Sequence, residues 1–182
     1  EEAEPEDPLK RHAFRFVMAV AILSSVGPLL WAKWLPFVDY PQHLGTIAAM
    51  AGQGDLAWSY YFDVEIGRVQ YLFFYLLAQF LAFPFGVEWG ARLALVFGLA
   101  PLPLAVAAFL KAHGRAPLGA ALSGAVVLNV FVFWGFVNYC MAFAWALFAL
   151  SVLARLIRKP DLWNCVGFGF LTLLCFYTHA QV

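Results

Sequence analysis

The chain has 182 residues, of which 64% are hydrophobic and 12% are charged, and its formal net charge is zero. Soluble domains carry about 25% charged residues, so this composition excludes an ordinary soluble protein and indicates one that resides in a lipid bilayer. The sequence has no basic patch interleaved with aromatic residues, which leaves nucleic-acid binding without support.

The amino-terminal residues 1–13 are acidic and contain two prolines, which predicts a disordered tail. A first apolar span follows near residues 14–35, and Trp31 and Trp34 near its end are typical of a membrane interface. No small-x-small cleavage pattern follows this span, so we interpret it as an anchor and not as a signal peptide. Because the sequence lacks an initiator Met and ends inside an apolar stretch, we expect a fragment of a longer membrane protein.

A polar first loop is expected over residues 36–68, and it holds four of the six acidic residues that lie outside the tail. Within it, Pro41 suits the first turn of a helix. Apolar residues then recur at helical spacing, namely Leu44, Ile47, Ala48 and Ala51. This pattern predicts a juxtamembrane amphipathic helix that lies on the bilayer surface.

Further uncharged intervals predict spans near residues 69–87, 91–110, 116–135, 137–154 and 162–179. Each suits one crossing, because a bilayer core of roughly 30 Å needs about 20 apolar residues of helix. The long interval around 116–154 is interpreted as a hairpin that turns near Gly135, with Asn138 satisfying the open backbone of the turn. Residues 14–182 are therefore predicted to form one all-α polytopic membrane module with about six transmembrane helices.

The signals for orientation disagree. Lys10, Arg11 and Arg15 favour a cytoplasmic amino terminus. Strict alternation over six spans would then place the basic residues near 111–115 and 155–159 outside, against the positive-inside tendency. We expect a cytoplasmic amino terminus because the first helix usually dominates.

Asp39 and His43 lie four positions apart at the start of the predicted loop helix, so they can share one face of it. One interpretation is that Asp39 caps the helix, which is worth about 1 kcal/mol, and that His43 is an interfacial side chain. The other is a carboxylate that acts as general base or metal ligand with His43 assisting. For His179, at the end of the last predicted span, contact with a lipid phosphate and snorkelling to the interface are both open.

The acidic residue Asp39, followed by Pro41 and His43 and a juxtamembrane helix, resembles the amino-terminal part of bacterial GT-C-type membrane glycosyltransferases. The stretches 85–93, 134–139 and 177–179 resemble short connections of the same group. Such enzymes transfer a sugar from a polyprenyl-phosphate donor at the outer face of the membrane. The resemblance implies that Asp39 is the catalytic acid of the first loop, which deprotonates the acceptor hydroxyl or helps to position a metal and phosphate.

The resemblance also implies substrate-binding residues, namely His43, Asp63, Glu65, Arg68 and His179. Asp39 and His43 are the expected ligands if a divalent cation is the cofactor. The expected partners are membrane lipid, the polyprenyl-phosphate sugar donor and partner membrane subunits, and the expected location is the bacterial inner membrane.

Two other classes of function stay open. The apolar hairpin and the many aromatic residues also suit a non-catalytic accessory or scaffold subunit of a larger membrane complex. A haem- or pigment-binding subunit would use His43 or His179 as an axial ligand, and visible absorbance of the purified protein would discriminate it.

Overall fold

The computed structural model describes residues 8–52, 55–66 and 69–180, and within these ranges it contains helices and no strand. In chain order the helices are α1 (Pro8–Trp31), α2 (Tyr40–Ala51), α3 (Leu56–Ser59), α4 (Leu72–Leu99), α5 (Pro101–Ala112), the 3-10 helix η2 (Pro117–Val126), α6 (Val130–Trp134), α7 (Val137–Arg158) and α8 (Leu162–Thr178). The predicted all-α fold is confirmed.

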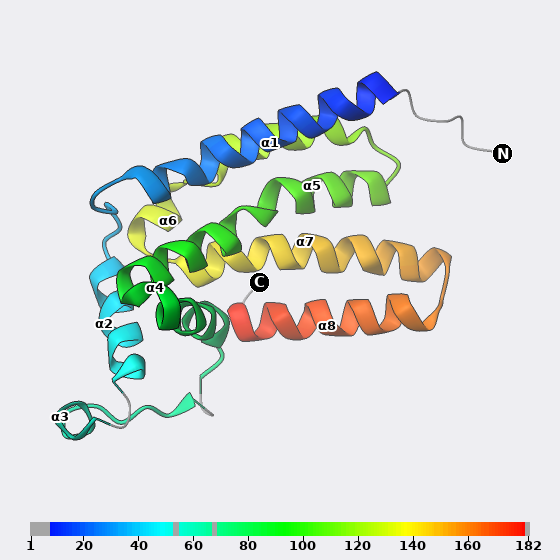
Figure 1. Ribbon diagram of the computed structural model, residues 1–182. Helices are drawn as coiled ribbons and strands as arrows, with labels where there is room; N and C mark the ends of the chain where they lie inside the picture. Colours follow the sequence, from blue (N-terminus) through cyan, green and yellow to red (C-terminus); the bar gives the residue numbers. More distant parts are fainter. Residues whose placement is uncertain (1–7, 53–54, 67–68, 181–182) are drawn as a thin grey trace.

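The long helices α1, α5, α7 and α8 run side by side, and α2 and α3 lie at one end of this bundle (Figure 1). α7 packs between α5 and α8, η2 packs against both α1 and α5, and α2 packs on α4. The first loop and the carboxyl end of α8 therefore meet at the same end of the molecule (Figure 1).

Among the described residues, four stretches are long and apolar enough to cross a membrane, which indicates a membrane protein. They are Pro8–Trp31, Leu72–Ala112, Pro117–Trp134 and Val137–Arg158. The predicted number of about six spans is not confirmed, because the spans expected near 69–87 and 91–110 fall in one stretch. The last expected span corresponds to α8, which has 17 residues and is shorter than these four.

The stretch that begins with α4 is not a straight rod. Gly86 has a non-helical backbone with φ 79° and ψ 163°, and a Cβ built on Gly90 would lie 2.7 Å from the Ala78 carbonyl oxygen and 2.6 Å from the Ala82 nitrogen. In a straight helix, residues eight and twelve positions apart lie about 12 and 18 Å apart along the axis. The chain therefore folds back at Gly86, close to the break that the sequence predicted between residues 87 and 91.

Two local predictions need correction. α1 begins at Pro8, so residues 8–13 are helical and do not belong to a disordered tail, and residues 1–7 lie outside the described residues. The juxtamembrane helix exists as α2, but its Ile47 is fully buried and Leu44 packs against the same core. The apolar stripe thus faces α4, whose apolar surface covers it, and not the bilayer surface.

A buried arginine on α4 holds the end of α1. Arg92 is 5% exposed, and its Nη1 donates to the carbonyl oxygens of Leu29 (3.0 Å) and Ala32 (2.6 Å). Its Nη2 donates to the Lys33 carbonyl oxygen (2.8 Å), and its Nε donates to the Glu88 carboxylate (2.7 Å). The last carbonyls of a helix have no partner inside the helix and form the negative end of the helix dipole. The guanidinium supplies both hydrogen-bond donors and a positive charge there, and it fixes where the first loop begins.

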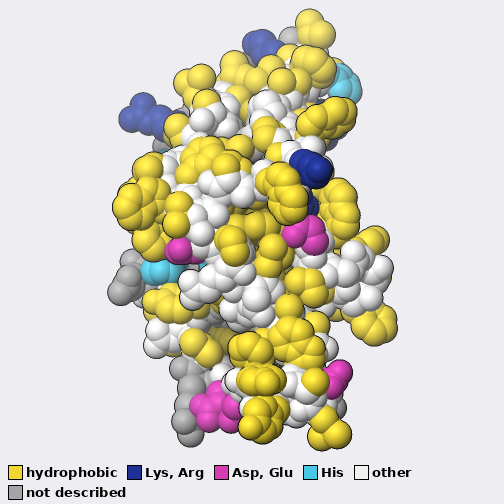
Figure 2. Space-filling model, turned by 90° about the vertical axis from the view of Figure 1, so that its left-hand side faces the viewer, with side chains coloured by type: hydrophobic (Ala, Val, Ile, Leu, Met, Phe, Trp, Pro, Cys, Tyr) yellow, Lys and Arg dark blue, Asp and Glu magenta, His cyan; other side chains and the backbone are white. Residues whose placement is uncertain are grey.

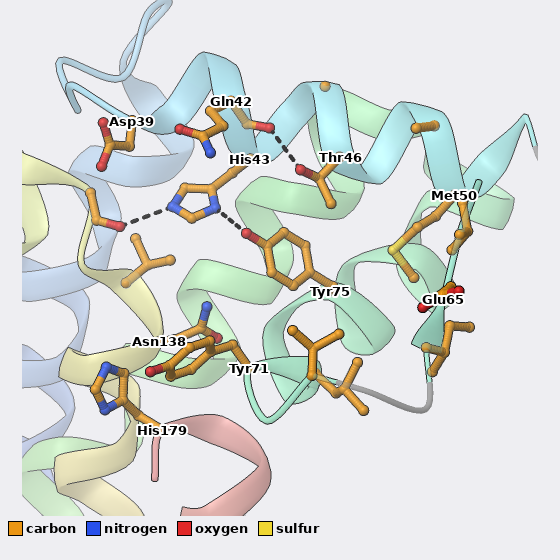
Figure 3. A pocket seen from close by; sticks show the side chains of 18 of the residues that line it. Asp39, Gln42, His43, Thr46, Met50, Glu65, Tyr71, Tyr75, Asn138 and His179 are labelled. Atoms are coloured by element: carbon orange, nitrogen blue, oxygen red, sulfur yellow. Dashed lines mark hydrogen bonds between the residues drawn. The ribbon is translucent and has the colours of Figure 1, made fainter. Parts of the chain in front are cut away.

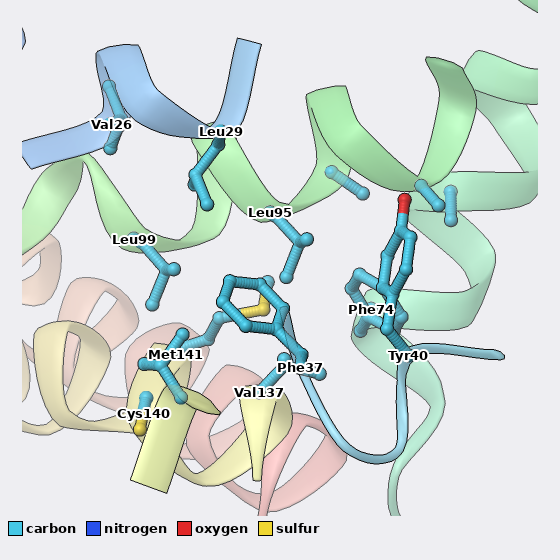
Figure 4. Close-up of a cluster of buried hydrophobic side chains, with 14 of the residues drawn as sticks. Val26, Leu29, Phe37, Tyr40, Phe74, Leu95, Leu99, Val137, Cys140 and Met141 are labelled. Carbon is cyan, nitrogen blue, oxygen red and sulfur yellow. The ribbon is translucent and has the colours of Figure 1, made fainter. Parts of the chain in front are cut away.

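The first loop is anchored in the core beside this contact. Phe37 is buried and lies among side chains from α1, α4 and α7, including Leu95 and Met141 (Figure 4). The Phe37 ring also meets the Phe133 ring edge-on, with centroids 5.7 Å apart. The residues that follow Phe37 are consequently held at a fixed place at the end of the bundle.

We expect Arg92→Leu to lower the free energy of unfolding by about 3 kcal/mol, because it leaves buried carbonyls and the Glu88 carboxylate without their partner. Arg158→Leu, an exposed position of α7, is the matched control and should change it by less than about 0.5 kcal/mol. Unfolding in detergent micelles measures both, and equal stability of the two variants would contradict the proposed role of Arg92.

Candidate functional site

A pocket of about 910 Å³ opens at the end of the bundle that holds the first loop. α2 forms one wall, residues from 62–66 and 69–75 form another, and the turn at residues 135–139 lies beneath them with His179 (Figure 3). The surface at this end has many hydrophobic side chains, and basic, acidic and histidine side chains are scattered among them (Figure 2). A volume of this size suits a small-molecule ligand.

The pocket brings together five of the six residues that the sequence predicted for the site. Its lining includes Asp39, His43, Asp63, Glu65 and His179. The sixth, Arg68, lies outside the described residues.

Asp39 is the N-cap residue of α2, but its side chain forms no capping hydrogen bond. Nor does its carboxylate form a hydrogen bond or an ion pair with any residue in the described ranges. The capping interpretation is therefore wrong. The half-buried carboxylate stays available to a molecule in the pocket.

The turn after α6 holds Asp39 in place. Gly135 ends α6 in the left-handed conformation with φ +99°, which favours glycine. A Cβ built on Gly135 would lie 2.5 Å from the Cβ of Asp39, so only glycine permits this approach. Beside it, the Val38 amide donates to the Phe133 carbonyl oxygen at 2.9 Å. The turn lies where the sequence predicted the hairpin, and it supports the first loop.

His43 joins three segments. Its Nε2 lies 2.9 Å from the Gly135 carbonyl oxygen and its Nδ1 lies 2.8 Å from the Tyr75 hydroxyl (Figure 3). A carbonyl only accepts, so Nε2 carries a proton, and in the neutral ring Nδ1 accepts from the Tyr75 hydroxyl. Both nitrogens are thus engaged by the protein, and a metal ion could bind this ring only after one of the bonds broke.

Among the described residues there is no group of three or more His, Cys, Asp or Glu side chains that could hold a metal ion. The predicted metal site of Asp39 with His43 does not fit, because the histidine is already bonded.

The remaining predicted residues lie on the other walls. Asp63 and Glu65 are exposed and face the pocket opposite the turn. The ring of His179 packs against Tyr71 and Tyr139, with centroids 4.8 and 5.2 Å apart respectively. His179 is therefore part of an aromatic floor.

The phenol of Tyr40, next to Asp39, is not suited to act as a base. Tyr40 is buried, and burial raises the pKa of its hydroxyl well above the ordinary value, with the charge of Glu88 raising it further. The phenol therefore stays protonated at neutral pH and cannot serve as a base beside Asp39.

Sequence reasoning missed several lining residues. Tyr71 and Tyr75 were not singled out; Tyr71 is the N-cap residue that precedes α4, and Tyr75 lies in the first turn of that helix. Asn138 was expected to satisfy the backbone of the turn. Instead its side chain forms no hydrogen bond within the described part of the chain, and it lines the pocket.

Fold and pocket together define an all-α membrane protein with a polar and aromatic pocket at one end of its bundle. No protein-family model, no curated protein and no solved structure matches this chain.

We expect Gly135→Ala to destabilise the protein by about 1 to 3 kcal/mol, because alanine is strained at this φ and its Cβ collides with Asp39. Gly169→Ala is the control, since a Cβ there meets nothing within 4 Å. Thermal unfolding of both variants tests this expectation, and unchanged stability of Gly135→Ala would contradict the close approach to Asp39.

Proposed function

We propose that this chain is a GT-C-type membrane glycosyltransferase that transfers a sugar from a polyprenyl-phosphate donor at the outer face of the bacterial inner membrane. The observation that carries the proposal is the Asp39 carboxylate, which lines a ligand-sized pocket and has no partner among the described residues. An acidic group that the fold leaves unused at the end of an apolar bundle suits chemistry on a lipid-linked substrate.

In the proposed reaction, Asp39 accepts the proton of an acceptor hydroxyl. The hydroxyl oxygen attacks the anomeric carbon of the sugar, and the bond from that carbon to the phosphate oxygen breaks. Its electron pair leaves with the polyprenyl phosphate. A carboxylate serves as general base when it lies within hydrogen-bond reach of the hydroxyl, and the half-buried position of Asp39 on the pocket wall allows such contact.

The other pocket residues divide into supporting roles. His43 positions the site by tying α2 to Tyr75 and to the Gly135 turn. Asp63 and Glu65 add acidic groups on the opposite wall. Arg68, which lies outside the described residues, is proposed to pair with the donor phosphate.

We expect Asp39→Asn to lower the rate of sugar transfer at least about 100-fold, because the amide cannot accept the proton. Asp55→Asn is the matched control in the same loop. Asp55 does not line the pocket and caps α3 through the Ala57 amide at 2.8 Å, and asparagine caps equally well. Transfer to acceptor by the purified variants measures the effect, and full activity of Asp39→Asn would end the catalytic assignment.

A divalent cation, where it is the cofactor, would be held by the Asp39 carboxylate and would supply positive charge that offsets the charge of the leaving phosphate. EDTA should then abolish transfer, and Mg²⁺ or Mn²⁺ should restore it. Transfer that persists unchanged in EDTA would show that Asp39 acts without a metal.

A further inference from the structure

Asn138 is a buried amide that the fold does not use. It is the second residue of α7 and is 8% exposed, and its side chain points into the pocket below His43 (Figure 3). Its Oδ1 is buried without a hydrogen-bond partner, and no residue of the described ranges bonds to its Nδ2. Buried side-chain polar atoms in folded proteins nearly always have a partner, and the described residues do not supply one for this amide, which faces the pocket.

The surrounding backbone does not supply that partner. The amide of Val137 donates to the Gly135 carbonyl at 2.7 Å, and the amide of Cys140 donates to the Phe136 carbonyl at 3.1 Å. The turn is thus closed by its own backbone groups, although the sequence predicted that Asn138 would close it. The side chain remains directed at the pocket contents.

The chemistry of the amide selects the kind of ligand. A carboxamide presents one acceptor and two donor hydrogens side by side. A phosphate or carboxylate would satisfy only the donors, whereas a hydroxyl group both donates and accepts. The Asp39 carboxylate, on the wall formed by α2, lines the same pocket and already gives it a negative charge. A neutral hydroxyl therefore suits this position better than an anion.

The floor beside Asn138 is aromatic. Tyr71 and Tyr139 are half-buried, line the pocket and flank the ring of His179. Aromatic rings offer a flat apolar surface with a polar edge, and a pyranose ring offers the complementary combination of an apolar C–H face and hydroxyls around its rim.

We infer that Asn138 and the Tyr71–His179–Tyr139 floor form a sugar subsite, in which the Asn138 amide hydrogen-bonds a ring hydroxyl of the transferred sugar. This inference rests on the proposed function and deepens it. It assigns the residue that distinguishes a glycosylated polyprenyl phosphate from the bare lipid phosphate.

The test uses the full chain in lipid nanodiscs and native mass spectrometry. The probes are undecaprenyl phosphate without a sugar and the same lipid carrying glucose, galactose or mannose. The wild type should bind at least one glycosylated lipid about fivefold or more tighter than the bare lipid. Asn138→Leu should reduce this preference to less than about twofold and leave binding of the bare lipid unchanged. Asn164→Leu, an asparagine outside the pocket, should keep the preference.

The stability of the ligand-free protein distinguishes a role of Asn138 in sugar recognition from a role in the fold. Because Asn138→Leu removes a buried amide that has no protein partner, its apo form should unfold at the same or a higher temperature than the wild type. A marked fall would assign Asn138 to the fold and overturn the inference. Asn138→Ala, which introduces no extra volume, replaces the leucine variant if that variant does not assemble.

The remaining outcomes keep the two proposals apart. Equal binding of all four lipids by the wild type, or a full preference in Asn138→Leu, would overturn the sugar subsite, even if transfer depends on Asp39. An Asn138-dependent preference without any transfer activity would support the subsite and overturn the proposed enzyme. Asp39→Asn should keep the preference, because it removes the base and not the sugar contacts.

Discussion

The pocket depends on the contact between the end of α6 and the start of α2. Gly135 approaches Asp39 so closely that no side chain fits between them, and its carbonyl oxygen accepts the Nε2 proton of His43. An unpaired backbone carbonyl is costly inside an apolar bundle, so this bond both satisfies the open turn and holds α2 at its place. The wall that carries Asp39 is fixed by a contact across 92 positions of sequence.

The buried Arg92 helps to position the first loop for that contact. The guanidinium binds the last carbonyls of α1 and the carboxylate of Glu88, so α1 ends at a defined point on α4. Phe37 then enters the core and the Val38 amide bonds to the Phe133 carbonyl. Between α1 and α2 the chain has successive polar and apolar anchors, which explains how the loop residue Asp39 is held at a defined position.

The polar groups of the pocket differ in whether the protein already satisfies them. Both nitrogens of His43 are engaged, which makes this residue a support for the site. The Asp39 carboxylate and the Asn138 amide have no hydrogen-bond partner in the part of the chain that is described. Because an unsatisfied buried group lowers stability, the retention of the buried Asn138 amide points to a ligand. Together with the half-buried Asp39 carboxylate it carries the two proposals made for this protein.

The all-α membrane class, the helix that contains Pro41 and the turn at Gly135 could be predicted from the amino-acid sequence, because uncharged runs, helical spacing and glycine act within a few neighbouring residues. The sequence also singled out Asp39. Other features are visible in the folded structure alone. α4 folds back at Gly86, and α2 packs on α4. Tyr75 and Gly135 form hydrogen bonds with His43, and the Asn138 amide has no partner among the described residues. These features arise where distant segments meet, and no local pattern specifies which polar groups are satisfied there.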